Sequence, residues 1–139
     1  MSIPLYAQEG LHIAPFFNGQ FHNRNDATEI LLKGHKLKPY RLSLFRSITL
    51  SASAPEVRTI EQAVLADGAT AIDKEMSYSG ANKHLYYGFY QLKRSGSVRR
   101  YLFFRNNSLN PTHSRKRTVT LIYMEGTASI DDLKRNFGK

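Results

Sequence analysis

Cysteine is absent from this chain of 139 residues, and tryptophan is absent as well. Without cysteine, neither a disulfide framework nor a zinc site built on thiolates can form. Long hydrophobic runs are also missing, so the sequence predicts no membrane association, and the N-terminus shows no secretory signal. These absences predict a cytoplasmic protein, or a nuclear or viral one if the host is eukaryotic.

Acidic residues are missing from two long stretches of the chain, whose formal net charge is +9. Between Glu75 and Glu125 nine lysines and arginines stand without any acid, and between Glu29 and Glu56 there are five more. A high net charge serves general solubility. Solubility alone does not require charges to be sorted along the chain, so the sorting favours a positive surface that meets a polyanion.

Two segments carry the sequence signals of helices. Ser53 and Glu56 form a capping box at the start of the first. Pro55 fits its first turn, apolar residues recur at helical spacing, and Gly68 supplies its stop. A second helix is predicted over Ser129–Phe137, with the serine as its cap.

Several segments have the patterns of strands. Tyr40–Leu50 alternates apolar and polar residues with the period of two that is typical of a half-buried strand. Leu85–Lys93 and Val98–Arg105 are rich in aromatic residues and flank a turn that contains glycine, which predicts a hairpin. Thr118–Met124 alternates as well, and Glu29–Lys33 favours a further short strand.

This order of elements predicts a single α+β domain over residues 1–139. We expect a mostly antiparallel sheet of four to five strands with two helices, in the order β-α-β-β-β-α over residues 40–139. Residues 1–39 are expected to form an irregular segment that packs on the sheet. Both helices are expected to cover one face, which leaves the other face as the working surface.

The expected working surface combines cations with aromatic rings. Tyr101 and Phe103 alternate with arginines on one face of their strand, and bases stack on such rings while cations meet phosphates. The alternative is that both rings belong to the core. The basic loop 106–117 is suited to gripping a phosphate backbone, and we predict a nucleic-acid-binding protein, with RNA favoured over DNA. The predicted contact residues are Arg41, Arg46, Lys93, Arg94, Arg99, Arg100, Tyr101, Phe103, Arg105, Arg115, Lys116 and Arg117.

A second interpretation is a small metal-independent endoribonuclease, although binding alone is favoured. His84 and His113 flank the basic strands and are the candidates for general acid and base. Arg99 and Arg105 would then lie near the scissile phosphate. The alternative for each histidine is an ordinary surface position. No metal-ligand spacing and no cofactor motif occurs in the sequence, so we expect neither a metal nor a cofactor.

A third interpretation is a protein-interaction or inhibitor module that docks an acidic partner. Exposed strand edges and strands rich in tyrosine suit such contacts. The aromatic hairpin also leaves room for a homodimer.

In the order of its elements alone, the chain resembles two known architectures. Residues 53–137 are similar to the double-stranded-RNA-binding domain, in which a helix is followed by three strands and a helix. Residues 40–139 are similar to the RelE-like messenger-RNA interferase toxins, whose sheet carries basic catalytic residues. Both resemblances imply contact with RNA, and no residue role is transferred because no motif is shared.

Overall fold

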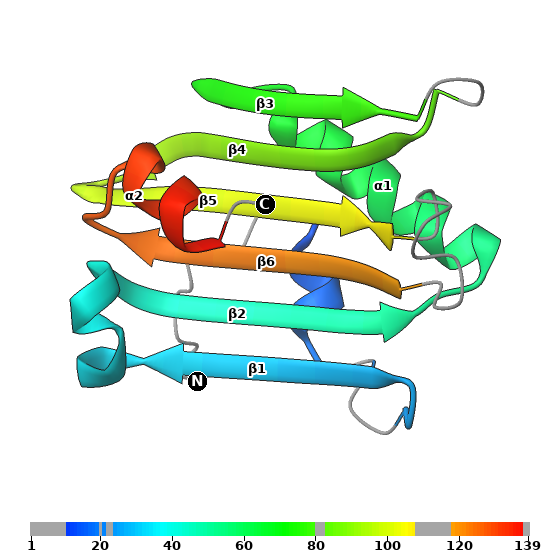
Figure 1. Ribbon diagram of the computed structural model, residues 1–139, viewed down its shortest axis with the longest axis horizontal. Coiled ribbons are helices and arrows are strands. Elements are labelled where there is room, and N and C mark those ends of the chain that lie inside the picture. The colour runs from blue at the N-terminus through cyan, green and yellow to red at the C-terminus, as the bar shows by residue number, and fades with distance from the viewer. Residues whose placement is uncertain (1–10, 20, 22–23, 80–82, 108–117, 138–139) are drawn as a thin grey trace, which may run out of the picture.

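Six antiparallel strands form one sheet in the order β1-β2-β6-β5-β4-β3 (Figure 1). The computed structural model describes residues 11–19, 21, 24–79, 83–107 and 118–137. The strands are β1 (Ala27–Lys33), β2 (Leu42–Ser51), β3 (Asp73–Tyr78), β4 (Leu85–Ser95), β5 (Val98–Asn106) and β6 (Thr118–Gly126).

Helices cover both faces of this sheet. α1 (Ala54–Gly68) and the short 3₁₀ helix η1 (Ala14–Phe17) lie on one face, and α2 (Ile130–Phe137) lies on the other (Figure 1). A second 3₁₀ helix, η2 (Gly34–Tyr40), links β1 to β2. The α+β class is therefore confirmed. The expectation that both helices share one face is wrong, because α2 packs against the face opposite α1.

The sheet has six strands, where four to five were predicted. β1 is longer than the short strand expected at residues 29–33, and with η2 it gives regular structure to much of the segment expected to be irregular. No sequence signal predicts β3, because five of its six residues are exposed. An edge strand that meets water on both faces lacks the alternation from which strands are recognised.

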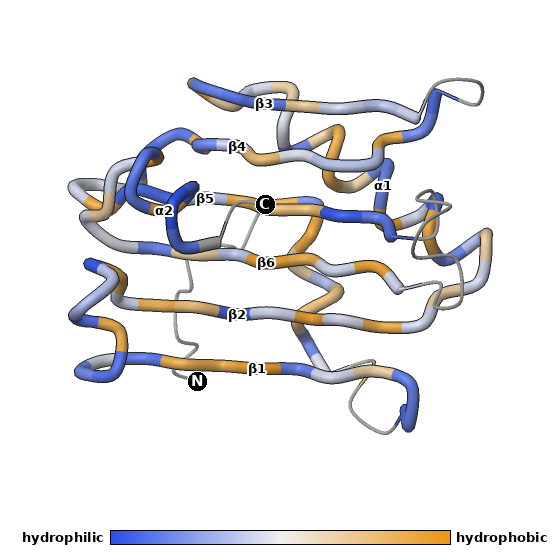
Figure 2. The backbone as a smooth tube through the Cα atoms, viewed as in Figure 1, coloured by the Kyte–Doolittle hydropathy of each residue, from blue (hydrophilic) through white to orange (hydrophobic). Residues whose placement is uncertain are grey.

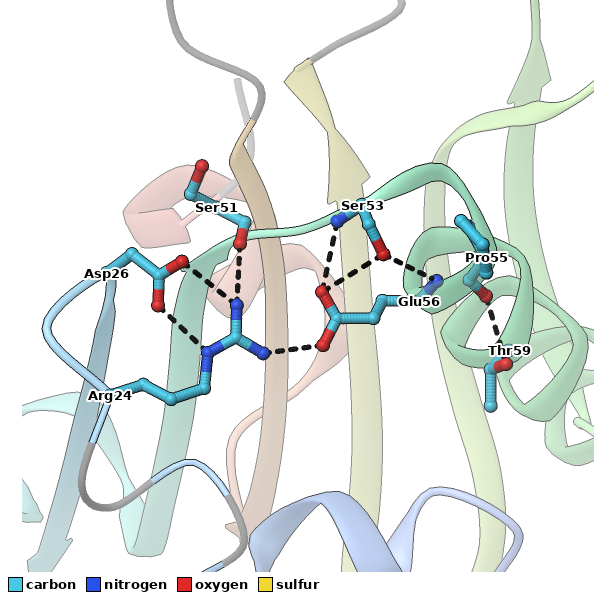
Figure 3. Close-up of polar contacts among 7 residues, drawn as sticks. All are labelled: Arg24, Asp26, Ser51, Ser53, Pro55, Glu56 and Thr59. Atoms are coloured by element: carbon cyan, nitrogen blue, oxygen red, sulfur yellow. Dashed lines mark hydrogen bonds and ion pairs between the residues drawn. The ribbon is translucent and has the colours of Figure 1, made fainter.

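Both α-helices begin at the caps that the sequence predicts. The Ser53 hydroxyl accepts from the backbone N–H of Glu56 (3.4 Å), and the Glu56 carboxylate accepts from the N–H of Ser53 (3.0 Å) (Figure 3). In α2 the N–H of Asp132 donates to the Ser129 hydroxyl (3.1 Å), and the Asp132 carboxylate accepts from the N–H of Ser129 (3.3 Å). Each reciprocal pair satisfies two N–H groups that a first helical turn leaves without partners.

Hydrophobic layers lie on both sides of the sheet. On one side, Ile60 and Val64 of α1 are buried against the central strands. On the other side, Leu133 of α2 is buried among aromatic side chains of β4 and β5. Neighbouring residues of β5 serve different layers, with Phe104 in the first and Phe103 in the second. Burial of each such side chain contributes about 1.5–3 kcal/mol.

Arg24 ties the N-terminal segment to the start of α1 (Figure 3). Its Nε and Nη2 both donate to the Asp26 carboxylate at 2.9 Å, and Nη2 also donates to the carbonyl of Ser51 at 3.0 Å. Its Nη1 reaches Glu56 Oε2 at 2.5 Å. The guanidinium holds the pKa of Asp26 below its ordinary value. The pKa of Glu56 is also lowered, first by the N–H of Ser53 and then by Arg24.

Replacing Arg24 with glutamine is expected to destabilise the fold at neutral pH and to have little effect in acid. Carboxylates whose pKa is lowered in the folded state stabilise it above their ordinary pKa, and this contribution is lost as the pH falls through the folded value. Thermal unfolding of the wild type and the Arg24→Gln variant at about pH 7 and about pH 3 measures the difference. Equal losses at both pH values would show that the ion pairs with Asp26 and Glu56 do not carry the effect.

Candidate anion-binding cleft

The two stretches without acidic residues meet at one end of the sheet. Leu42, at the start of β2, pairs with Gly126 of β6, and Gly126 pairs in turn with Arg99 of β5. Neighbouring strands lie about 4.8 Å apart, so β2 and β5 run about 10 Å from each other here. The register of the sheet therefore places η2 and the turn of the β4–β5 hairpin at the same end, although they are distant in the sequence (Figure 1).

A cleft of about 430 Å³ opens at this meeting point. The lining includes two cationic residues, Lys38 and Arg41, and two residues with hydroxyl groups, Ser43 of β2 and Ser97 of the hairpin turn. The volume lies within the range of ~300–1,000 Å³ that is typical of ligand sites. The residues around the cleft are Lys38, Arg41, Leu42, Ser43, Ser97, Val98, Gly126 and Thr127.

Arg41 has a left-handed backbone conformation, with φ at 59°. Its N–H donates to the carbonyl of Lys38 at 2.9 Å, and its own carbonyl accepts from the N–H groups of Thr127 (2.9 Å) and Ala128 (3.0 Å). A left-handed residue other than glycine costs about 1–2 kcal/mol, which these three hydrogen bonds offset. The guanidinium itself stays largely in solvent, 71% exposed and 4.0 Å from Asp132.

Further cations lie at the same end of the sheet as the cleft, on η2, β4 and β5. Lys36 of η2 and Lys93 and Arg94 of β4 are exposed, and within the part of the chain that the structure describes none of them forms an ion pair. Arg99 and Arg100 are less exposed and brace the backbone. Arg99 Nη1 donates to two carbonyls after β6 at 3.4 Å, and Arg100 Nε donates to the carbonyl of Lys93 at 2.7 Å.

Two of the predicted contact arginines lie away from the cleft. Arg105 lies over the rings of Tyr87 and Phe103, 5.7 and 5.6 Å from their centroids. Arg46 faces the side of the sheet that η1 and α1 cover. There its Nη2 donates to the carbonyl of Phe17 at 2.6 Å, and its guanidinium lies 5.2 Å from the Phe17 ring. The structure therefore brings Arg41, Lys93, Arg94, Arg99 and Arg100 to one end of the sheet but leaves Arg46 and Arg105 elsewhere.

The aromatic residues of the predicted working surface are buried. Tyr101 is 0% and Phe103 4% exposed, because α2 covers this part of the sheet. The Tyr101 hydroxyl donates to the carbonyl of Ala128 at 2.5 Å. Neither ring is open to stacking on a base, and both belong to the core. The open aromatic face that the sequence suggested is thus closed by the second helix.

Of the two histidine candidates, His84 lies among the described residues and His113 does not. His84 lies beside α1, with its Nδ1 3.5 Å from Oε1 of Glu61. Arg99 and Arg105 are six positions apart on β5, which separates them by about 20 Å, too far for one scissile phosphate. His113, Arg115, Lys116 and Arg117 lie outside the described residues.

Two buried carboxylates of α1 hold chain segments in place. Asp67 accepts from the backbone N–H groups of His12 (2.7 Å) and Ile13 (2.9 Å), and from Nδ1 of His12 (2.9 Å). Glu61 Oε2 accepts from the N–H of Leu85 at 3.2 Å. Sequence patterns do not predict these contacts, since both link residues far apart in the chain. Among the residues that the structure describes, no group of three His, Asp or Glu could hold a metal ion.

Of the residues around the cleft, only Arg41 was among the predicted contact residues, and the cation Lys38 and the serines Ser43 and Ser97 were not. The acid-free stretch between Glu29 and Glu56 is the signal that points to Lys38. No feature of the sequence near Ser43 or Ser97 predicts a binding role. The two serines come to the same cleft only because the register of the sheet aligns the strands that carry or flank them.

Residues 1–137 match the model of a family of unknown function, DUF6108. The chain belongs to this family. No curated protein and no solved structure shows significant similarity to the chain. In the part that the structure describes, no helix has the length and apolar composition needed to cross a membrane.

Replacing Gly126 with alanine is expected to destabilise the protein by about 1–3 kcal/mol, because the added methyl group would overpack the sheet end. A Cβ atom here would lie 2.4 Å from the carbonyl oxygen of Arg41 and 2.6 Å from Cα of Leu42, and backbone atoms cannot move aside cheaply. Thr127→Ala is the neighbouring control, for which we expect a change within about 0.5 kcal/mol. Urea unfolding compares them, and equal stabilities would contradict the close approach.

Proposed function

We propose that the protein binds nucleic acid, with RNA ahead of DNA, by holding its phosphate backbone at the cationic end of the sheet. The observation that carries this proposal is the pairing of Leu42 with Gly126 and of Gly126 with Arg99. This pairing gathers cations of two acid-free stretches around one cleft. Phosphate contacts of this kind supply most of the affinity of sequence-independent binding.

The spread of the cations favours a polyanion over a single small anion. Lys38 and Arg41 lie at the β2 side of this end, and Lys93 and Arg94 lie at the β4 side, three strand spacings away. Three spacings amount to about 14 Å. One phosphate group cannot contact both sides, whereas successive phosphates of one strand can.

An exposed ring at the same end favours single-stranded nucleic acid. Tyr40, the last residue of η2, is 42% exposed and directly precedes Arg41. An exposed tyrosine beside cations is the combination on which unpaired bases stack. Because RNA usually presents unpaired bases in loops and single strands, this arrangement supports RNA as the first ligand to test.

Removing two cations from this end is expected to weaken binding and to flatten its salt dependence. In the Lys38→Gln/Arg94→Gln variant, the slope of log K against log salt should fall by about 1.4, since each phosphate contact with a single strand contributes about 0.7. The matched control is Arg58→Gln/Lys83→Gln, which removes the same charge from exposed residues of α1 and the turn before β4. Fluorescence anisotropy with a labelled single-stranded RNA measures both.

Equal losses in the two variants would show that only net charge matters and that the cleft has no special part. Absence of wild-type binding to RNA and to DNA at low salt would refute the proposal. Tighter binding to DNA than to RNA would retain the site and correct the ligand.

Tyr40→Leu is expected to weaken RNA binding at least about fivefold while leaving the salt slope unchanged, because stacking is lost and phosphate contacts remain. Tyr78 is 51% exposed on β3, at the other end of the sheet, so Tyr78→Leu serves as the control and should bind like the wild type. The same anisotropy titration tests both variants. Unchanged affinity of Tyr40→Leu would exclude stacking on this ring.

A further inference from the structure

The two edge strands of the sheet differ in how they are protected. β3 carries Asp73, Lys74 and Glu75, and its pairing with β4 shifts register between Ser77 and Tyr78. Lys134 of α2 also reaches Glu75 at 2.8 Å. Charged side chains and irregular pairing are the usual means by which an edge strand avoids pairing with another chain.

β1 has none of these protections along its central residues. It pairs with β2 in an unbroken register over all seven residues, and it contains no proline. Ile30 is 43% and Leu31 49% exposed, and they form the hydrophobic middle of this edge (Figure 2). In the part of the chain that the structure describes, only β2 pairs with β1. A regular, apolar edge strand of this kind is a template for a further strand.

The sequence of β1 is complementary to itself when two copies run antiparallel about Leu31. Leu31 then lies opposite Leu31 of the second copy, and Ile30 lies opposite Leu32. Glu29 lies opposite Lys33, and Lys33 lies opposite Glu29. Opposite charges directly across two antiparallel strands attract, whereas like charges repel. A register centred on Ile30 would instead place both charged residues opposite apolar or small ones.

The faces of β1 agree with this register. Glu29, Leu31 and Lys33 alternate along the strand and therefore point to one face, so the two charge pairs flank the central leucine pair on that face. Ile30 and Leu32 form a continuous apolar strip on the other face. In this contact the pair of Glu29 with Lys33 occurs once on each side of Leu31. Such a repeat is the two-fold symmetry that most homodimers have.

We propose that the protein forms a homodimer through β1, with Leu31 on the two-fold axis and the six-stranded sheets joined into one. The occupant of the edge is a second copy of the chain. Its β1, running antiparallel, places a lysine opposite each glutamate and apolar residues opposite apolar residues. This dimer is independent of nucleic-acid binding, which involves the end of the sheet and not its edge.

Charge reversal at the two flanking positions tests the register. Glu29→Lys would place two lysines opposite each other at both ends of the contact, and Lys33→Glu would do the same with two glutamates. Each single variant is expected to raise the dimer dissociation constant at least about tenfold. Analytical ultracentrifugation of the full chain across a concentration series measures this, with Lys74→Glu on the opposite edge as a control that should dimerise normally.

Mixing the two single variants is the decisive step. A Glu29→Lys chain and a Lys33→Glu chain have opposite charges at every pair of this register, so the heterodimer should form. Capture through a C-terminal tag on one variant should retain the other. The Glu29→Lys/Lys33→Glu double variant should recover the wild-type homodimer. These recoveries also show that the single variants fold.

Three results would overturn the proposal. A monomeric wild type across the concentration series would exclude the dimer. Single variants that dimerise like the wild type would exclude β1 as the contact. Single variants that are weakened and fail to form a heterodimer when mixed would exclude the register centred on Leu31.

Discussion

Burial of the central strands on both faces is the constraint on which the rest of this structure depends. α1 and η1 cover one side of the sheet and α2 covers the other, so neighbouring residues of β5 alternate between two hydrophobic layers. A sheet covered in this way has little free surface over its middle. Its ends and its edges are the places that remain for contact with other molecules, and both proposed contacts lie there.

The same constraint accounts for the distribution of charge. Lysine and arginine are rarely buried without partners, so they are concentrated where the strands leave the covered region. Lys93 and Arg94 stand near the end of β4, and Arg99 and Arg100 stand near the start of β5. Arg46 is the exception, because it lies in the middle of β2. Its guanidinium donates to the carbonyl of Phe17 and lies over the Phe17 ring, whose electron-rich face attracts a cation.

Local features of this fold could be predicted from the sequence, and long-range ones could not. The capping box of Ser53 and Glu56 and the alternation in Tyr40–Leu50 involve residues close in the chain, so their patterns are visible there. The large side chains on both faces of β4 were compatible with either a central strand or a stacking surface. The side taken by α2 decides between them, and no residue pattern encodes that side. β3 lacks a pattern altogether, because water meets both of its faces.

The cleft depends on pairing at long range, since β6 enters between β2 and β5 and brings Gly126 against Arg41. The backbone at residue 41 favours glycine, yet the chain has arginine there. Glycine would remove the conformational cost but would also remove the cation from a residue that lines the cleft. Three backbone hydrogen bonds hold Arg41 in its left-handed conformation while its side chain stays in solvent. Backbone strain of this kind clusters at functional sites, and it accords with the contact that we propose between Arg41 and phosphate.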